Sequence, residues 1–446
     1  MNTARGTRPV RIANCSGYFG DRITAAQEMV DGGPIDFLTG DWLAELTMLI
    51  LWKQRRRNAE AGYASTFLTQ MEQVLGTCID RGIKVVTNAG GLNPAGCAER
   101  VRDIATRLGL KVNVAHVEGD DLMDRIDGLR PHLDHLDTGA KFEVEPVSAN
   151  AYLGAWGIVS ALDSGADVVV CPRVTDASVI VGPAAWWWGW GRTDWDRLAG
   201  AVAAGHVIEC GSQATGGNYA FFQEIPDLSK PLAFPLAEVE QDGSCVITKH
   251  EGTGGLVSVG TVTAQLLYEI GGPGYLNPDV VTRVDTITLQ QEAPNRVRMS
   301  GARGEPAPDT TKVCINFEGG FRNRMTFCLT GPNQLQRSGR ARALEHPRLL
   351  HDDPSRRGTA VRGLLAGARP LLRGRPPRGP PRRDAHRYRT LADGSCVGER
   401  DHPTGSTEGA RATARQRTHD RGALRCAFRR QGRQRERRYL GPSGRR

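Results

Sequence analysis

Polar residues and glycines are concentrated in short loops that directly follow predicted strands. The clearest loop follows the β-branched run 83–87 and contains Asn88, Gly90, Gly91 and Asn93. Asn93 stands where the N-cap of the next helix belongs, so free backbone N–H groups should point out of this turn. Such a turn favours a carboxylate, a phosphate or a carbonyl oxygen. The two glycines could instead serve only close packing of the helix against the strand.

Five further loops have the same Gly, Asn and Asp character, at 16–22, 40–45, 118–121, 173–176 and 210–218. In an open parallel sheet, ligands bind beyond the carboxyl ends of the strands, so these loops should meet at one sheet edge. We therefore predict that Asp41, Glu118 and Asp176 lie near one another despite their separation in sequence.

Candidate acid/base groups and one candidate nucleophile come from these segments. The predicted catalytic residues are Asp41, Glu45, Glu118, Asp176, His206 and Cys210. The Cys210 thiol precedes a Gly-rich turn whose N–H groups could stabilise an oxyanion. His206 and His250 are the histidines of suitable type, although each could be purely structural. Any single carboxylate is more often a helix cap or a solvated loop residue than a catalytic group.

The predicted ligand-binding residues could present N–H groups, amides or cations to an anion. They are Gly17, Arg22, Asn88, Gly90, Gly91, Asn93, Arg173, Gly216, Gly217 and Asn218. The loop carboxylates could also bind a divalent cation, so the cofactor stays open. No metal-ligand set is assigned, because the ten cysteines lack CxxC pairs and the Cys/His spacing of zinc sites. The sequence contains no GxGxxG, P-loop or GxSxG motif.

The elements that must position these loops indicate an α/β fold with a Rossmann-like open parallel sheet and helices on both faces. Strands are predicted at 10–15, 35–38, 83–87, 111–117, 167–171 and 207–210, and helices ending near 29 and 57 and spanning 65–81, 94–108 and 151–163. The strands at 83–87 and 111–117 should form one parallel pair joined by a right-handed crossover. A tryptophan cluster (Trp186, Trp187, Trp188, Trp190 and Trp195) falls in a Gly-rich connection, and a core or subunit-contact role suits it better than ligand stacking.

From about residue 226 short strands dominate, at 245–248, 280–289, 297–299, 313–317 and 325–329, with one helix near 262–270. We therefore predict an α/β domain over 8–225, a smaller α+β portion over 226–331, and a separate Arg-rich segment over 332–446. That last segment contains 29 arginines, no lysine and 10 acidic residues, a net charge of +19, whereas the whole chain carries +9. The first 331 residues are therefore acidic, at −10.

Two interpretations of the Arg-rich segment remain. An Arg, Pro, Gly and Ala surplus without lysine is typical of a GC-rich gene read out of frame, and the change follows Gly331 abruptly. A natural basic tail that neutralises nucleic-acid phosphates is the alternative. In both cases we predict that the segment lacks a packed core.

Six ordered motifs resemble the acyclic terpene utilisation AtuA family over about residues 8–331. They are G-Y-F-G-D-R (17–22), F-L-T-G-D-W-L-A-E-L-T-M (37–48), V-V-T-N-A-G-G-L-N-P-A-G (85–96), V-E-G-D-D-L (117–122), C-P-R-V-T-D-A-S (171–178) and E-C-G-S-Q-A-T-G-G-N (209–218). The resemblance implies bacterial catabolism of citronellol- and geraniol-type or other branched acyl chains, beside acyl-CoA carboxylases and enoyl-CoA hydratases. Many members continue into a small ferredoxin-like domain, and this sequence departs from that pattern after Gly331.

The residues and the resemblance together predict a catabolic enzyme that acts on a branched acyl-CoA or related carbonyl compound by proton transfer, as a hydratase, lyase or isomerase. CoA would then be part of the substrate. The alternatives are a non-catalytic accessory subunit of an acyl-CoA enzyme and an Arg-rich nucleic-acid-binding protein. We expect a homo-oligomer without membrane or nucleic-acid partners. The longest apolar run, 48–52, is far below a membrane span and no signal sequence is evident, so a cytoplasmic location is expected.

Overall fold

The computed structural model describes residues 5–135 and 138–319 in full. Beyond them it describes only the backbone of β16 (Phe321–Arg322), β17 (Val361–Arg362), β18 (Tyr388–Thr390), β19 (Cys396–Gly398), β20 (Arg425–Arg430) and β21 (Gln434–Leu440). The chain divides into two units, Met1–Glu318 with Gly363–Ala368 and Arg421–Arg446, and Gly319–Arg362 with Arg369–Asp420. The elements discussed below belong to the first unit. The strand predicted at 325–329 and the packing predicted for 332–446 lie outside the described residues.

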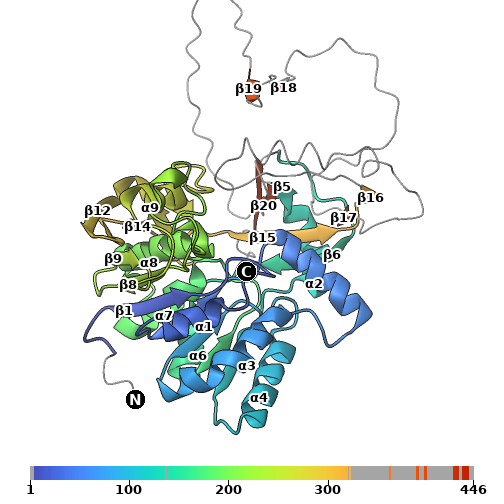
Figure 1. Ribbon diagram of the computed structural model, residues 1–446. Coiled ribbons are helices and arrows are strands. Elements are labelled where there is room, and N and C mark those ends of the chain that lie inside the picture. The colour runs from blue at the N-terminus through green and yellow to red at the C-terminus, as the bar shows by residue number, and fades with distance from the viewer. Residues whose placement is uncertain are drawn as a thin grey trace, which may run out of the picture. The chain divides into compact units, whose positions relative to one another are not determined.

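One mixed nine-stranded sheet forms the centre of the first unit, in the order β12-β13-β9-β8-β1-β2-β3-β7-β4 (Figure 1). Its parallel part consists of β1 (Val10–Asn14), β2 (Phe37–Gly40), β3 (Lys84–Thr87), β7 (Val168–Val170) and β4 (Val114–His116). Its antiparallel part consists of β8 (Leu236–Val239), β9 (Cys245–Thr248), β13 (Arg296–Ser300) and β12 (Thr288–Ala293). The α/β class with a parallel sheet is confirmed, and the later strands extend the same sheet from β1.

Helices cover both faces of this sheet because the parallel strands are apolar on both sides. The helices are α1 (Ala25–Asp31), α2 (Glu45–Arg57), α3 (Ser65–Asp80), α4 (Pro94–Arg107), α6 (Trp156–Asp163), α7 (Ser178–Trp188), α8 (Trp195–Ile208) and α9 (Val259–Leu266). Ala13 and Leu38 belong to one core with α1 to α4, whereas Ile12 and Phe37 belong to the other with α6 to α9. This alternation along single strands is the period of two expected of β-structure.

The order of the parallel strands creates a topological switch point between β3 and β7. From β1 to β4 the chain moves across the sheet in one direction, so right-handed crossovers place α1, α3 and α4 on one face. It then steps back to insert β7 between β3 and β4, which places α6 on the other face. After β3 the chain enters α4, and after the neighbouring β7 it enters α7 on the opposite face. Ligands bind at such a point in doubly wound folds.

Three of the sequence predictions are wrong. The strand at 111–117 does not pair with the strand at 83–87, because β7 lies between them. Residues 207–210 are not a strand, since α8 continues to Ile208. Of the tryptophans, only Trp190 lies in a connection, since α7 includes Trp186 to Trp188, with Pro183 inside it, and α8 begins at Trp195. Almost every residue of α7 and of the last eleven of α8 is buried, which removes the amphipathic period that marks a helix in sequence.

Four of the five tryptophans have the core role predicted for them, and Trp195 is exposed. Trp186, Trp187 and Trp190 are buried, and the Trp188 and Trp190 indole N–H groups donate to carbonyls of β8 and of the turn that follows it. In Figure 1, α8, α9, β8, β9 and β12 gather at one end of the described part of the chain, with α3 and α4 side by side away from them.

A second sheet contributes residues to the candidate site that is described below. β6 (Pro146–Ala151) pairs antiparallel with β15 (Thr311–Phe317), in a sheet whose full order is β5-β20-β21-β15-β6, with β5 at Asp134–His135. β10 (Gly274–Leu276), β11 (Val281–Arg283) and β14 (Arg303–Glu305) form a third sheet. The strand predicted at 280–289 is therefore split between β11 and β12 by a short 3-10 turn at Val284–Thr286.

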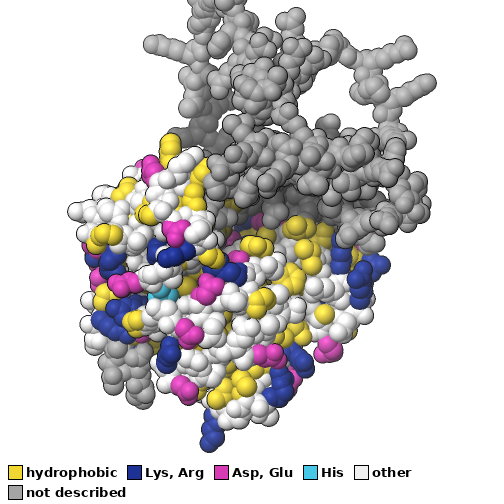
Figure 2. Space-filling model, viewed as in Figure 1, with side chains coloured by type: hydrophobic (Ala, Val, Ile, Leu, Met, Phe, Trp, Pro, Cys, Tyr) yellow, Lys and Arg dark blue, Asp and Glu magenta, His cyan; other side chains and the backbone are white. Residues whose placement is uncertain are grey.

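Among the described residues, no helix combines the length and apolar character needed to cross a bilayer. On the face shown in Figure 2, acidic and basic side chains of the described part are interspersed.

The close contact between the β3 and β7 loops gives a first prediction. A Cβ at Gly90 would lie 2.6 Å from the Cys171 carbonyl oxygen and 2.8 Å from Pro94 Cα. Gly90→Ala should therefore lower the free energy of unfolding by about 1–3 kcal/mol in urea titrations. Gly76→Ala, in the interior of α3 with no atom within 4 Å of the new Cβ, should raise it by about 0.5–1 kcal/mol. Equal effects of the two substitutions would contradict the tight loop contact.

Candidate active site

The loops that follow β2, β3 and β7 meet at the switch point. The Gly90 N–H donates to the Cys171 carbonyl at 3.0 Å, and the Asn88 N–H donates to the Gly40 carbonyl at 3.4 Å. These bonds hold the polar residues after each strand against those of its neighbour. The edge at which we predicted a site therefore contains a single cluster of charged side chains.

Asp41 is held in this cluster by Asn88. The Asn88 amide donates to Asp41 Oδ1, and its own oxygen accepts from the Trp42 N–H at 2.7 Å. Leu43 N–H also points to Asp41 Oδ1, at 3.3 Å. Asn88 is completely buried and its amide is used at both ends. Asn88 therefore positions Asp41 and the start of α2, and its predicted contact with a ligand stays a prediction.

Arg173 is the cation at the centre of the cluster and is only 1% exposed. Its Nη1 donates to the Leu43 carbonyl, and its Nη2 lies 2.8 Å from Asp176 Oδ1. The guanidinium also stacks over the Tyr152 ring, with Cζ 4.0 Å from the ring centroid. A buried charge with these contacts costs free energy unless anions surround it, so Arg173 fixes where the acidic residues must lie.

A second cation, Lys312 of β15, contacts both the Tyr152 ring and the Glu45 carboxylate. The Tyr152 hydroxyl donates to Glu45 Oε1 at 2.6 Å, and Lys312 Nζ donates to the same oxygen at 2.9 Å. Lys312 Nζ lies 4.2 Å from the Tyr152 ring centroid. Lys312 and Asp176 are about one-fifth exposed, whereas Glu45 and Tyr152 are buried. The partly exposed pair is therefore where solvent or a ligand can reach the cluster.

Asp120 closes the cluster on the β6 side. Its Oδ2 accepts from the Asn150 amide at 2.8 Å and from the Arg173 N–H at 3.2 Å. Burial raises the pKa of Asp120 to about 6, against the opposing effect of these two hydrogen bonds. The Asn150 side-chain oxygen and Arg173 Nε are buried without a hydrogen-bond partner in the described part of the chain.

The electrostatics single out Asp41 as an acid. Burial, followed by the nearby Asp176 and Glu209 charges, raises the pKa of Asp41 well above its ordinary value. Arg173 and the Asn88 hydrogen bond oppose that rise without cancelling it. The raised pKa favours the protonated form of Asp41, whose neighbours include the Arg173–Asp176 ion pair. Two carboxyl groups of different protonation state at one site can divide the roles of acid and base.

Several predicted site residues lie elsewhere or do structural work. Glu118 is exposed and bonds His116 at 3.0 Å, so it does not join Asp41 and Asp176 as we predicted. Asn93 caps α4 through the Gly96 N–H and donates to the Glu60 and Ala61 carbonyls. Gly91 has φ +52°, and a Cβ there would lie 2.3 Å from Leu51 Cδ1. A larger residue at 91 would therefore disturb packing whether or not a ligand binds.

The remaining candidates form a second group near the ends of β1 and α8. Arg22 ion-pairs with Glu28 at 2.7 Å and stacks over Phe234. His206 is buried in α8, with Nε2 2.8 Å from the Tyr268 carbonyl, and His250 bonds the Met29 carbonyl. The other members of this group, which pack around a turn next to α8, are Gly17, Cys210, Gly216, Gly217 and Asn218.

Sequence reasoning missed Asn14, Tyr152, Glu209 and Lys312. None of the four stands in a loop after a parallel strand, which was the signal used. The pairing of Tyr152 and Lys312 depends on the β6–β15 sheet, which brings together segments about 160 residues apart.

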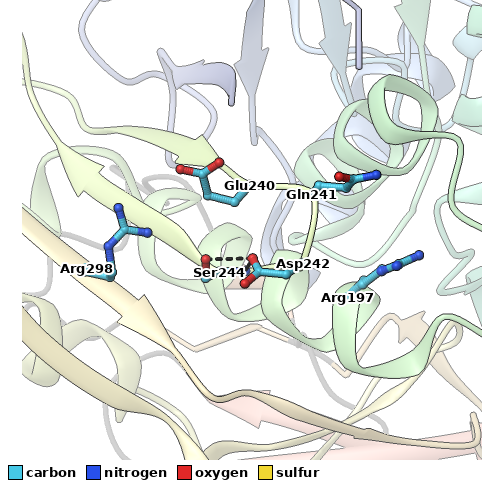
Figure 3. Close-up of a pocket in the computed structure, with 6 residues that line it drawn as sticks. All are labelled: Arg197, Glu240, Gln241, Asp242, Ser244 and Arg298. Atoms are coloured by element: carbon cyan, nitrogen blue, oxygen red, sulfur yellow. Dashed lines mark hydrogen bonds between the residues drawn. The ribbon is translucent and has the colours of Figure 1, made fainter. Parts of the chain in front are cut away.

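Within residues 5–135 and 138–319, no group of three or more His, Cys, Asp or Glu side chains has an arrangement that could hold a metal ion. The open hollow in Figure 3, of about 410 Å³, lies between the β8–β9 turn, α8 and β13. Arg197, Glu240, Gln241, Asp242, Ser244 and Arg298 line it. The hollow contains none of the residues of the Arg173 cluster.

The fold and site define an open α/β protein with a buried acid–arginine cluster at its switch point. Residues 10–375 match the family described as acyclic terpene utilisation family protein AtuA, and the chain belongs to this family. Membership implies a role in acyclic terpene utilisation. The match extends beyond Gly331, where we expected the resemblance to end, and the out-of-frame origin of the following segment stays a prediction. No curated protein and no solved structure matches the chain.

The raised pKa of Asp120 gives a second prediction. The folded protein should keep this proton up to about pH 6, whereas the unfolded chain loses it near pH 4. The protonated Asp120 therefore stabilises the folded protein below pH 4. The free energy of unfolding should fall by on the order of 3 kcal/mol as the pH rises from 4 through 6. Asp120→Asn should remove this loss, because Asn can accept the same two hydrogen bonds and does not titrate.

The measurement is urea unfolding of both proteins at several pH values from 4 to 7.5. Asp121→Asn, at the exposed neighbouring position, is the matched control and should follow the wild-type profile. Parallel profiles for wild type and Asp120→Asn would mean that Asp120 titrates normally.

Proposed function

We propose that this protein is an enzyme of acyclic terpene catabolism that transfers a proton to or from a branched acyl-CoA or related carbonyl compound. The observation that carries the proposal is the buried Asp41 carboxyl, whose pKa is raised well above its ordinary value, next to the ion pair of Arg173 and Asp176 at the switch point of the sheet. Hydratases, lyases and isomerases of acyl thioesters share this proton transfer beside a carbonyl group, so the geometry supports the class and leaves the three reactions open.

Each charged residue has a role in such a reaction. Asp41 would supply a proton as general acid, and Asp176, the ion-pair partner of Arg173, would accept one as general base. Arg173 would stabilise negative charge that develops on the carbonyl oxygen, because its field acts in a site with little water. Its unpartnered Nε is a donor available for that oxygen, and Asn150 Oδ1 is an acceptor available for a hydroxyl group or water.

A non-catalytic accessory subunit is the second candidate, and one observation favours it. Arg173 and Asp41 are only 1% and 5% exposed, so a substrate must enter past Asp176 and Lys312. A cluster this closed could serve only to stabilise the fold for binding to a partner acyl-CoA enzyme. Such a subunit should bind no acyl-CoA by itself.

The third prediction separates the two candidates. We expect wild-type protein to bind at least one branched acyl-CoA in thermal-shift and calorimetric screens, and to turn it over without a partner protein. Asp41→Asn is a neutral isostere of the protonated acid and can accept the same bonds from Asn88 and Leu43, so the fold should persist. It should lower kcat by about 10²–10⁴ with little change in KM.

Asp242→Asn, in the hollow of Figure 3, is the matched control and should keep wild-type kcat. The proposed function would be contradicted if the folded wild-type protein bound no acyl-CoA, or if Asp41→Asn kept full activity.

A further inference from the structure

The segment that follows β9 lies at the same sheet edge as the Arg173 cluster. β9, β8 and β1 are successive strands of the large sheet (Figure 1). β9 pairs antiparallel with β8, with Thr248 opposite Leu236, and β8 pairs antiparallel with β1, with Leu236 opposite Ala13. Two antiparallel pairings restore the direction of β1, so β9 ends at the edge where the parallel strands end. Ligands bind beyond this edge in open α/β sheets, so the residues after Thr248 are placed to contribute to binding.

Lys249, the first residue after β9, is a buried cation that contacts only neutral oxygens. It is 8% exposed, and its Nζ donates to the Thr253 carbonyl at 2.8 Å and to the Thr253 hydroxyl at 3.3 Å. An ammonium group has three N–H donors, so one donor is left without an acceptor among the described residues. Lys84 and Lys312 are less deeply buried, and each forms an ion pair with a carboxylate. Lys249 lacks that compensation.

A second lysine, Lys230, belongs to a segment that packs against the loop after β9. A Cβ added at Gly254 would lie 2.9 Å from Lys230 Cβ and 2.2 Å from the Pro231 carbonyl oxygen. The Gly254 carbonyl also accepts from the Ala233 N–H at 3.2 Å, which fixes the two segments side by side. Burial, followed by the Lys230 charge, lowers the pKa of Lys249. This is the direction expected of a cation that has lost water and gained no anion.

The acidic residues of these two segments do not neutralise the lysines. Asp227 is exposed, and its carboxylate accepts two hydrogen bonds within its own turn. Glu251 is exposed as well, and in the described part of the chain no carboxylate lies within ion-pair distance of Lys249 or Lys230. Thr253, against which the Lys249 ammonium lies, is also exposed, so an anion can approach the ammonium from solvent on this side.

We propose that Lys249 and Lys230 form a phosphate-binding site, and that the acyl-CoA substrate supplies the phosphate group. A phosphate group carries close to two negative charges, so it can compensate both ammonium groups, whereas one carboxylate cannot. The ends of β2 and β9 are three strand spacings apart, on the order of 14 Å. The pantetheine arm of CoA separates the thioester from the phosphate groups by a comparable length, so one molecule can reach both the Arg173 cluster and Lys249. In naming CoA as the source, the inference rests on the proposed function.

The test compares calorimetric binding of isovaleryl-CoA and of isovaleryl-pantetheine, which lacks phosphate, to the full-length protein. Lys249→Met keeps the length of the side chain but removes the charge, so it should weaken isovaleryl-CoA binding about ten-fold or more and leave isovaleryl-pantetheine binding unchanged. Lys249→Arg keeps the charge and should retain most of the affinity. Lys111→Gln, at an exposed position before β4, removes the same charge and should have no effect. Equal isovaleryl-CoA affinity of wild type and folded Lys249→Met overturns the proposal.

A second measurement uses inorganic phosphate and the exposed Lys230, in case Lys249→Met does not fold. Phosphorus-31 NMR of wild-type protein should show millimolar phosphate binding that weakens in Lys230→Gln and with added salt. No phosphate binding, or binding that is unchanged in Lys230→Gln, overturns the site.

The two ligands also separate the site from the proposed function. A wild-type protein that binds phosphate through these lysines but binds no isovaleryl-CoA keeps the phosphate site and refutes acyl-CoA as its source, and with it the function. A protein that turns over isovaleryl-CoA equally well with and without Lys249 keeps the function and refutes the site.

Discussion

The burial of the Arg173 guanidinium is the constraint on which the rest of the site depends. A cation that is 1% exposed is tolerated only where anions and carbonyl oxygens surround it. Asp176, the Leu43 carbonyl and the Tyr152 ring meet that need directly. They come from the loop after β7, the loop after β2 and the end of β6, so one charge fixes the relation of three segments. The switch point supplies the place where these segments can meet.

Asp41 shows how such a cluster yields a functional group. The single full positive charge of Arg173 is shared among several carboxyl groups, and Asp176 holds it at 2.8 Å. Asp41 is buried and has no ion-pair partner of its own among the described residues, so its pKa rises. Asn88 fixes the position of that carboxyl through one oxygen and leaves the other free of that bond. Burial and charge competition thus raise the pKa of Asp41 without any unusual chemistry in the residue.

The sequence predicted the parallel sheet and its central loops because those depend on local signals. The runs at 83–87 and 167–171 are short, β-branched and followed by Gly or Pro, which marks a buried strand and its end. Asp41, Arg173 and Asp176 were found for the same reason. The insertion of β7 between β3 and β4 was not predictable, because nothing in the residues of one strand states which neighbour it pairs with. α7 and α8 were missed because uniform burial removes the helical period.

Contacts between side chains from distant segments could not be predicted from the sequence either. Tyr152 and Lys312 meet only through the pairing of β6 with β15, and the end of α8 is held against β1 by the Asn14 side chain. The prediction for Glu118 was wrong for a different reason. Glu118 follows a strand as expected, but its side chain faces solvent. The residue two positions later, Asp120, is the one that turns inward to Arg173. The direction in which a loop side chain points depends on backbone geometry, which residue types alone do not specify.

The pairing of β15 with β6 makes the position of the Lys312 ammonium a matter of strand register. Alternate residues of β15 face different cores: Val313 and Ile315 belong to the small core with β6, whereas Cys314 belongs to the core beneath α2. Lys312 shares the face of Cys314, and this is why it reaches Glu45. A slip of β15 by one residue would bring Val313 to Glu45 and carry the ammonium to the opposite face. The ion pair between Lys312 and Glu45 can therefore form only when β15 pairs with β6 in its correct register.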